Sequence, residues 1–247
     1  MIFDCITLFI VALASGLVAF YVPKVSSGNY KLALVFAGSY LFSITIIHIF
    51  PDLFTTTDNA SILAVFVLAG FFLQQCLEFF SSGVEHGHIH KHDIGHAHKE
   101  SSAIWVLLAL GAHSLLEGSL LMHGLSNPDH PNSKTILWGI LLHKAPEAFA
   151  LMSVLLCEIE NKKKALAYLI LFAAASPIGL IASDLLIESD LISVKAFTYL
   201  FALVSGNFLH ISTTIVFESS VDHKFNAKKL GLALVAGLIA VFAEVLF

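Results

Sequence analysis

The chain of 247 residues contains no arginine, and only 13% of its residues are charged. Its 13 basic residues are lysines spread along the sequence, which excludes the clustered basic surface typical of proteins that bind DNA or RNA. Hydrophobic residues make up 57% of the chain. Because so little polar surface cannot cover a soluble globule of this length, the composition predicts a polytopic membrane protein.

Cysteine is also scarce. Cys5, Cys76 and Cys157 lie singly in hydrophobic segments, and no CxxC pair is present. We interpret them as small core residues, which excludes a disulfide framework or a zinc finger. A GxxxxGK[ST] segment is absent too, so no ATP site is expected.

What the sequence has is a series of long apolar runs. Eight of them approach the roughly 20 residues that a helix needs to cross about 30 Å of hydrocarbon. They lie near residues 4–22, 31–51, 61–80, 103–125, 135–157, 164–186, 195–217 and 228–246. The first run has Asp4 where a signal peptide carries basic residues, so we expect it to remain as a span. The pattern predicts an all-α bundle of eight transmembrane helices in a single domain, 1–247.

The lysines predict how this bundle is oriented, because basic residues in short loops stay in the cytoplasm. Ten lysines lie in or beside the loops that follow spans one, three, five and seven, whereas only Lys134 and Lys195 lie in the alternate loops. We therefore expect both termini on the extracytoplasmic side.

Two of the predicted spans carry a histidine and a glutamate four residues apart, namely His113 with Glu117 and His143 with Glu147. This spacing puts both side chains of a pair on one helical face, and imidazole with carboxylate suits zinc and similar divalent ions. With a rise of 1.5 Å per residue, His113 and His143 both come close to the bilayer midplane. The two pairs therefore predict a metal site with four ligands. The alternative is a structural His–Glu hydrogen bond within each helix, although burying a carboxylate in lipid costs about 3 kcal/mol.

These segments resemble the ZIP (zinc- and iron-regulated transporter-like) family of metal transporters. His113-Ser-Leu-Leu-Glu117-Gly118 is similar to the family pattern HNxxEG, and His143 to Glu147 is similar to HxxPE. Three further stretches look like that family: His48-Ile-Phe-Pro-Asp52, Ser176-Pro-Ile-Gly179 and Gly206-Asn-Phe-Leu-His210. Eight spans, extracytoplasmic termini and a histidine-rich loop after span three complete the resemblance.

The resemblance implies a carrier, not an enzyme, with His113, Glu117, His143 and Glu147 as the main ligands of a transported ion. It implies uptake of Zn²⁺ into the cytoplasm, with Fe²⁺, Mn²⁺, Co²⁺ or Cd²⁺ as other substrates and no catalytic cofactor. It further implies a homodimer embedded in a lipid bilayer, and we expect the plasma or inner membrane.

This chain departs from the two-metal site of some family members at three neighbouring positions, Ser114, Lys144 and Ser176. The departures predict a single-metal site. We expect the Lys144 ammonium to stand near the place of a second cation, as a tethered counter-charge for Glu117 or Glu147. In the rival interpretation, Lys144 faces away from the site and extends towards polar groups.

Other histidines and acids predict a route for the ion. His48 and Asp52 lie at the outer end of span two, and His210 lies nearer the cytoplasm in span seven. The cytoplasmic loop at about 81–102 is polar and rich in histidine, so it is expected to bind metal weakly. Its candidate ligands are His86, His88, His90, His92, His96 and His98. The alternative for this loop is a solvated linker with no part in transport.

An intramembrane zinc-dependent hydrolase is the alternative function. In that case three of the four ligands hold a zinc ion that activates water, and the remaining glutamate acts as a base. An HExxH segment is absent, which weighs against the hydrolase.

Overall fold

The computed structural model describes the chain apart from residues 22–26, 56–58, 82–98, 127–132, 219–225 and 247. Its described residues form helices and no strands, which confirms the all-α prediction. The long helices are α1 (Ile2–Tyr21), α2 (Ser27–Ile44), α4 (Ala60–Ser81), α5 (Lys99–Ser126), α6 (Ser133–Glu158), α7 (Lys162–Glu188), α8 (Val194–Glu218) and α9 (Ala227–Leu246).

Seven of these long helices each coincide with one predicted span to within a few residues, while the second predicted span, 31–51, extends beyond the end of α2 at Ile44. Seven helical segments within the described residues are long and apolar enough to cross a membrane. The eighth predicted span corresponds to α9, a helix of 20 residues. Most of the sequence signal for the fold is therefore the length of the apolar runs.

The second span has a local feature that its sequence did not predict. The short π-helix η1 (Thr45–Ile49) follows α2 and leads into α3 (Phe50–Thr55). The Phe50 N–H donates to the Thr45 carbonyl, and the Thr45 hydroxyl donates to the Leu41 carbonyl over 2.7 Å. Pro51 comes next and has no N–H to continue the ladder. The wider turn places His48 and Asp52 in buried positions.

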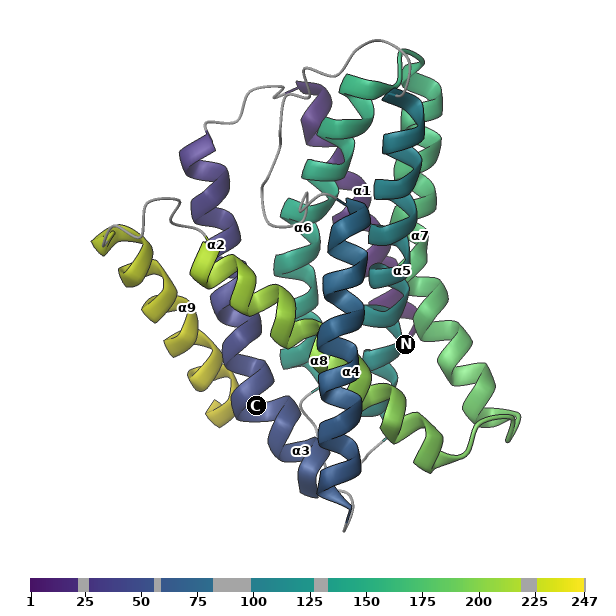
Figure 1. Cartoon of the computed structure of the whole chain (residues 1–247), viewed down its shortest axis with the longest axis vertical. Helices are drawn as coiled ribbons and strands as arrows, with labels where there is room; N and C mark the ends of the chain where they lie inside the picture. The colour runs from purple at the N-terminus through teal and green to yellow at the C-terminus, as the bar shows by residue number, and fades with distance from the viewer. Residues whose placement is uncertain (22–26, 56–58, 82–98, 127–132, 219–225, 247) are drawn as a thin grey trace.

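The helices pack as closely contacting pairs, α4 with α8, α5 with α7, α1 with α6 and α2 with α9. Figure 1 shows α8 crossing α4 diagonally, beside the group formed by α5, α6 and α7. Glycine lets α4 and α8 approach closely, because a Cβ at Gly70 would meet the backbone of Leu203 and one at Gly206 would meet that of Val67. Helices α5, α6 and α7, which follow one another in the chain, contact one another around the residues of the predicted metal site.

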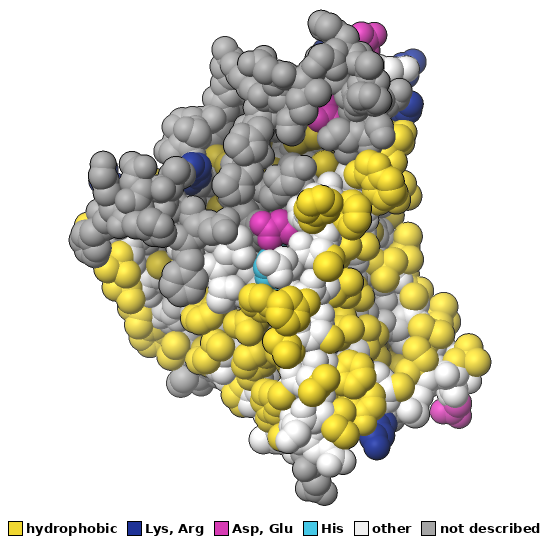
Figure 2. Space-filling model, viewed as in Figure 1, with side chains coloured by type: hydrophobic (Ala, Val, Ile, Leu, Met, Phe, Trp, Pro, Cys, Tyr) yellow, Lys and Arg dark blue, Asp and Glu magenta, His cyan; other side chains and the backbone are white. Residues whose placement is uncertain are grey.

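The outer surface of the bundle is apolar. Large hydrophobic side chains such as Val65 and Leu68 of α4 and Leu234 and Leu238 of α9 are more than half exposed. Figure 2 shows such side chains over much of the described face. This surface is suited to lipid, and the buried polar residues are concentrated between the helices.

Candidate metal centre

The structure brings the two predicted His/Glu pairs together. His113 and Glu117 come from α5, and His143 and Glu147 come from α6. One ligand atom from each residue lies within 4.8 Å of the others, and no side chain of the four is more than 1% exposed. The His113 and His143 ring centroids are 5.9 Å apart. The observed cluster is therefore consistent with the spacing argument.

The local geometry follows from two facing helices. Residues four apart lie one above the other on a helix, so each helix presents its histidine and glutamate on one face. Pro146 in α6 and Pro177 in α7 do not end their helices, which continue through both positions. The close packing of α5 on α6 then directs the two faces towards each other.

The two glutamates share the Lys144 ammonium and differ in the surroundings of their second oxygens. Glu117 Oε1 lies 2.9 Å from His113 Nε2, while its Oε2 is paired with the Lys144 ammonium. Glu147 Oε2 lies 3.1 Å from Lys144 Nζ. Its Oε1 has no hydrogen-bond partner among the described residues. One carboxylate oxygen of each glutamate therefore faces the lysine, while the second oxygen of Glu117 faces His113 and that of Glu147 has no hydrogen-bond partner among the described residues.

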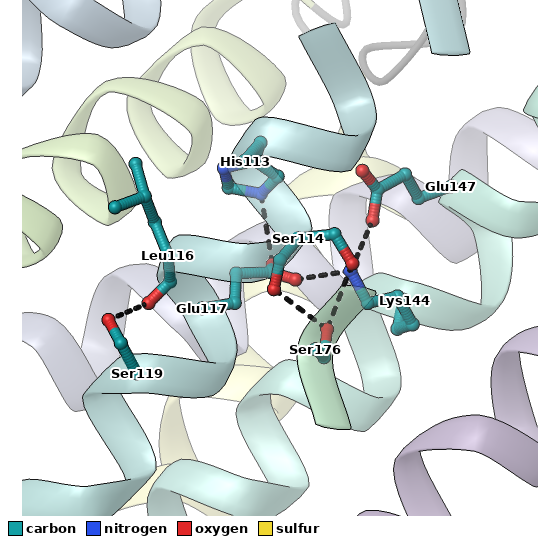
Figure 3. A network of polar contacts seen from close by, with 8 residues as sticks. All are labelled: His113, Ser114, Leu116, Glu117, Ser119, Lys144, Glu147 and Ser176. Atoms are coloured by element: carbon teal, nitrogen blue, oxygen red, sulfur yellow. Dashed lines mark hydrogen bonds and ion pairs between the residues drawn. The ribbon is translucent and has the colours of Figure 1, made fainter. Parts of the chain in front are cut away.

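Lys144 is a fully buried cation, 1% exposed, and it points into the site (Figure 3). Its ammonium has three protons, and it donates to Glu117, to Glu147 and to Ser114 Oγ, the last over 2.7 Å. The ring of Phe172 lies beside it, with its centroid 4.8 Å from Nζ. This geometry is inconsistent with the rival interpretation in which Lys144 faces away.

Ser114 and Ser176 link α5 to α7 beside the lysine. The Ser176 hydroxyl donates to the Ser114 carbonyl over 2.9 Å, so its single proton is already used. The hydroxyl of Ser114 must then donate across the 2.9 Å separation to Ser176 Oγ, while it accepts from Lys144. With both hydroxyl protons used in this way, Ser114 Oγ presents only a lone pair to the Lys144 ammonium. The serine pair therefore favours a cation at that position.

The backbones of α5 and α7 are in close contact at this level. A Cβ at Gly118 would meet the carbonyl of Ser176, and one at Gly179 would meet the carbonyl of Leu115. A Cβ at Gly111, by contrast, would meet no atom of a neighbouring residue within 4 Å. Gly118 and Gly179 thus allow the serine pair to form, and Gly111 has no such role.

The charges of the cluster suit a divalent cation. With neutral imidazoles, two carboxylates and one ammonium leave one net negative charge in a buried site. Isolated buried charges are costly, so this pairing stabilises the carboxylates in their ionised form. Two imidazole nitrogens and two carboxylate oxygens are a ligand set for zinc and for related first-row ions.

The predicted route residues lie outside the four-ligand cluster. His48 in η1 and Asp52 in α3 are each 7% exposed. His210 in α8 lies 2.7 Å, from Nε2 to Oε2, from Glu78 of α4, and its ring packs edge-on against Phe71 with the centroids 4.6 Å apart. The six loop histidines, from His86 to His98, lie outside the described residues.

Sequence reasoning missed Phe172 and Glu78. Phe172 precedes Ser176 by one helical turn, so the two share a face of α7, but a phenylalanine in an apolar span gives no signal of its own. Glu78 is the only charged residue in its predicted span, 61–80, but it lies two residues from the end of that span, where a charge can reach water and gives only a weak signal.

The sequence model of a family described as ZIP Zinc transporter matches residues 82–243, more than half of the chain. The matched segment contains all four residues of the metal cluster together with Ser114, Lys144 and Ser176.

Proposed function

Because this chain belongs to the ZIP zinc transporter family, we propose that it carries Zn²⁺ into the cytoplasm through the site between α5 and α6. Membership of this family is evidence that the protein transports divalent metal ions, and the apolar helices are evidence that it is an integral membrane protein. The observation that carries the proposal is the convergence of His113, Glu117, His143 and Glu147 within 4.8 Å. These four residues hold the ion in transit, with two nitrogens and two oxygens as its ligands.

The site takes one ion at a time. Lys144 bridges the Oε2 atoms of Glu117 and Glu147, which is the place that a second metal would need. The Oε1 atoms of the same glutamates take the transported ion, and His113 Nε2 and Glu117 Oε1 exchange their 2.9 Å contact for a shared contact with that ion. Lys144 therefore acts as a tethered counter-charge, and it keeps the empty site near neutrality during the return step.

The two carboxylates, and not the net charge of the cluster, support a divalent cargo. The empty cluster has one net negative charge, and the arrival of a divalent ion changes it to one net positive charge. A monovalent ion would leave the cluster neutral but would gain less from the two carboxylates. Fe²⁺, Mn²⁺, Co²⁺ and Cd²⁺ are expected to compete with Zn²⁺, since the same ligand set accepts them.

The direction of transport rests on the lysine distribution and the family. His48 and Asp52 gather ions on the extracytoplasmic side, and His210 with Glu78 lies on the way to the cytoplasm. The loop histidines receive the released ion. The protein functions as a homodimer in the plasma or inner membrane, with no covalent step and no catalytic cofactor.

Uptake of radioactive zinc into liposomes that contain only the purified protein tests this function. The wild type is expected to accumulate zinc, and Glu147→Ala to lose at least about 90% of the rate because a ligand is gone. Glu160→Ala removes an exposed glutamate from the connection between α6 and α7 and serves as the matched control. If liposomes with the wild-type protein accumulated no zinc, or if Glu147→Ala took up zinc at the full rate, the proposal would be contradicted. Addition of the other metals in the same assay measures their competition.

A further inference from the structure

Phe172 lies beside the metal centre without offering it a polar atom. Its side chain is 1% exposed, and the Lys144 ammonium lies 4.8 Å from its ring centroid. Because Phe172 and Ser176 are one turn apart on α7, a single helix face supplies both the ring and the serine hydroxyl. The ammonium thus has two carboxylates and a hydroxyl as hydrogen-bond acceptors and an aromatic ring as a further neighbour.

Binding of a divalent ion changes the balance of forces on that ammonium. The ion and the ammonium share the carboxylates of Glu117 and Glu147, so two like charges come close together in a buried site. Their repulsion drives Nζ away from the carboxylates. The face of an aromatic ring attracts a cation within about 6 Å of its centroid, and the attraction is greater when water is excluded. The ring of Phe172 is within this range and is buried.

We propose that Phe172 is a positioning residue that holds the Lys144 ammonium beside the site while the divalent ion is bound, and thereby sets the affinity of the site for its cargo. This inference rests on the proposed function, because it requires the ion to bind at the four-ligand cluster. Phe172 itself is not a ligand of the transported metal ion. Its effect on affinity passes entirely through the position of Lys144.

The KM of zinc uptake into liposomes measures the effect. Phe172→Leu keeps an apolar side chain but removes the ring, and it is expected to raise KM by about 2- to 30-fold, the range that a cation–π contact supplies. The maximum rate is expected to change less than KM. Phe172→Tyr keeps the ring face and should retain a KM within about twofold of the wild type. An unchanged KM in Phe172→Leu would overturn the inference.

Phe208→Leu is the matched control for lost packing. Phe208 lies in α8 and is fully buried, and among the described residues no ammonium lies over its ring. The same truncation there is expected to lower the unfolding temperature as much as Phe172→Leu does, but to leave KM unchanged. If both variants raise KM equally, Phe172 has only a packing role.

A double-mutant cycle that combines Phe172→Leu with Lys144→Met shows whether the effect of Phe172 on KM passes through the lysine. Phe172→Leu should raise KM in the wild type but have no effect on KM in the Lys144→Met background. The rise in unfolding temperature that zinc produces in detergent gives a second measurement on the same four proteins, which does not require transport. An equal effect of Phe172→Leu in both backgrounds would overturn the inference. Liposomes that take up no zinc at all would contradict the proposed function, whereas the zinc-induced temperature shift would still test Phe172.

Discussion

The Lys144 ammonium of α6 is paired with the Glu117 carboxylate of α5, and neither side chain is more than 1% exposed. This contact joins the two helices that supply the four residues of the His/Glu cluster. Glu147, one turn further along α6, completes the pairing over 3.1 Å. The chain therefore carries its own cation at the point where two buried carboxylates would otherwise repel each other.

Lys144→Met should destabilise the protein when no metal is present. The substitution leaves two buried carboxylates without their shared cation, and removal of one partner of a buried ion pair costs about 3–5 kcal/mol. Excess zinc should restore more stability to this variant than to the wild type. Thermal unfolding in detergent, with EDTA or with zinc, measures both effects. Lys162→Met, at an exposed position, is the control, and equal unfolding temperatures for the two variants in EDTA would contradict the role of Lys144.

Removal of zinc should lower the stability of the wild type through the four-ligand cluster. A ligand that binds only the folded state at 100 times its Kd adds about 2.7 kcal/mol, and EDTA removes this contribution. His143→Ala should lose most of the zinc-dependent stabilisation. His210→Ala should keep it, because His210 pairs with Glu78 outside the cluster. Equal losses in the two variants, measured by unfolding in detergent, would show that the cluster is not the main site.

Ser114→Ala should cost more stability than Ser176→Ala. The Ser114 hydroxyl accepts from a charged ammonium over 2.7 Å, and such bonds contribute about 1.5–3 kcal/mol. Ser176 exchanges hydrogen bonds only with neutral groups of Ser114, and each of these is worth about 0.5–1.5 kcal/mol. Chemical unfolding in mixed micelles gives the two values. A larger loss in Ser176→Ala would contradict the order of donors derived from the geometry.

Gly118→Ala should separate α5 from α7, whereas Gly111→Ala should not. The added Cβ at Gly118 meets the backbone of Ser176, which has no freedom to move away as a side chain has. We expect a loss of about 1–3 kcal/mol and a strongly reduced rate of zinc uptake. The Gly111 position is open, so alanine there should be neutral or stabilise the helix by up to about 1 kcal/mol. Similar uptake by the two variants would contradict the importance of this close contact.

Sequence reasoning located the helices and the two His/Glu pairs because both depend on local periodicity. Apolar runs of about 20 residues predict spans, and a histidine four residues from a glutamate predicts a shared helix face. Neither argument needs to know which helices are neighbours. The same reasoning missed η1, because its wider turn depends on how the segment around Pro51 packs and not on periodicity.

The amino-acid sequence by itself determined the all-α membrane fold, the two His/Glu pairs and the departures at Ser114, Lys144 and Ser176. Only the tertiary structure decided where the Lys144 ammonium lies. It follows His143 directly and so points about 100° further around α6, and the sequence does not say whether lipid or another helix lies there. The packing of α5 and α7 against α6 decided it, because Glu117, Ser114 and Phe172 come from those two neighbours and together bury the ammonium beside Glu147.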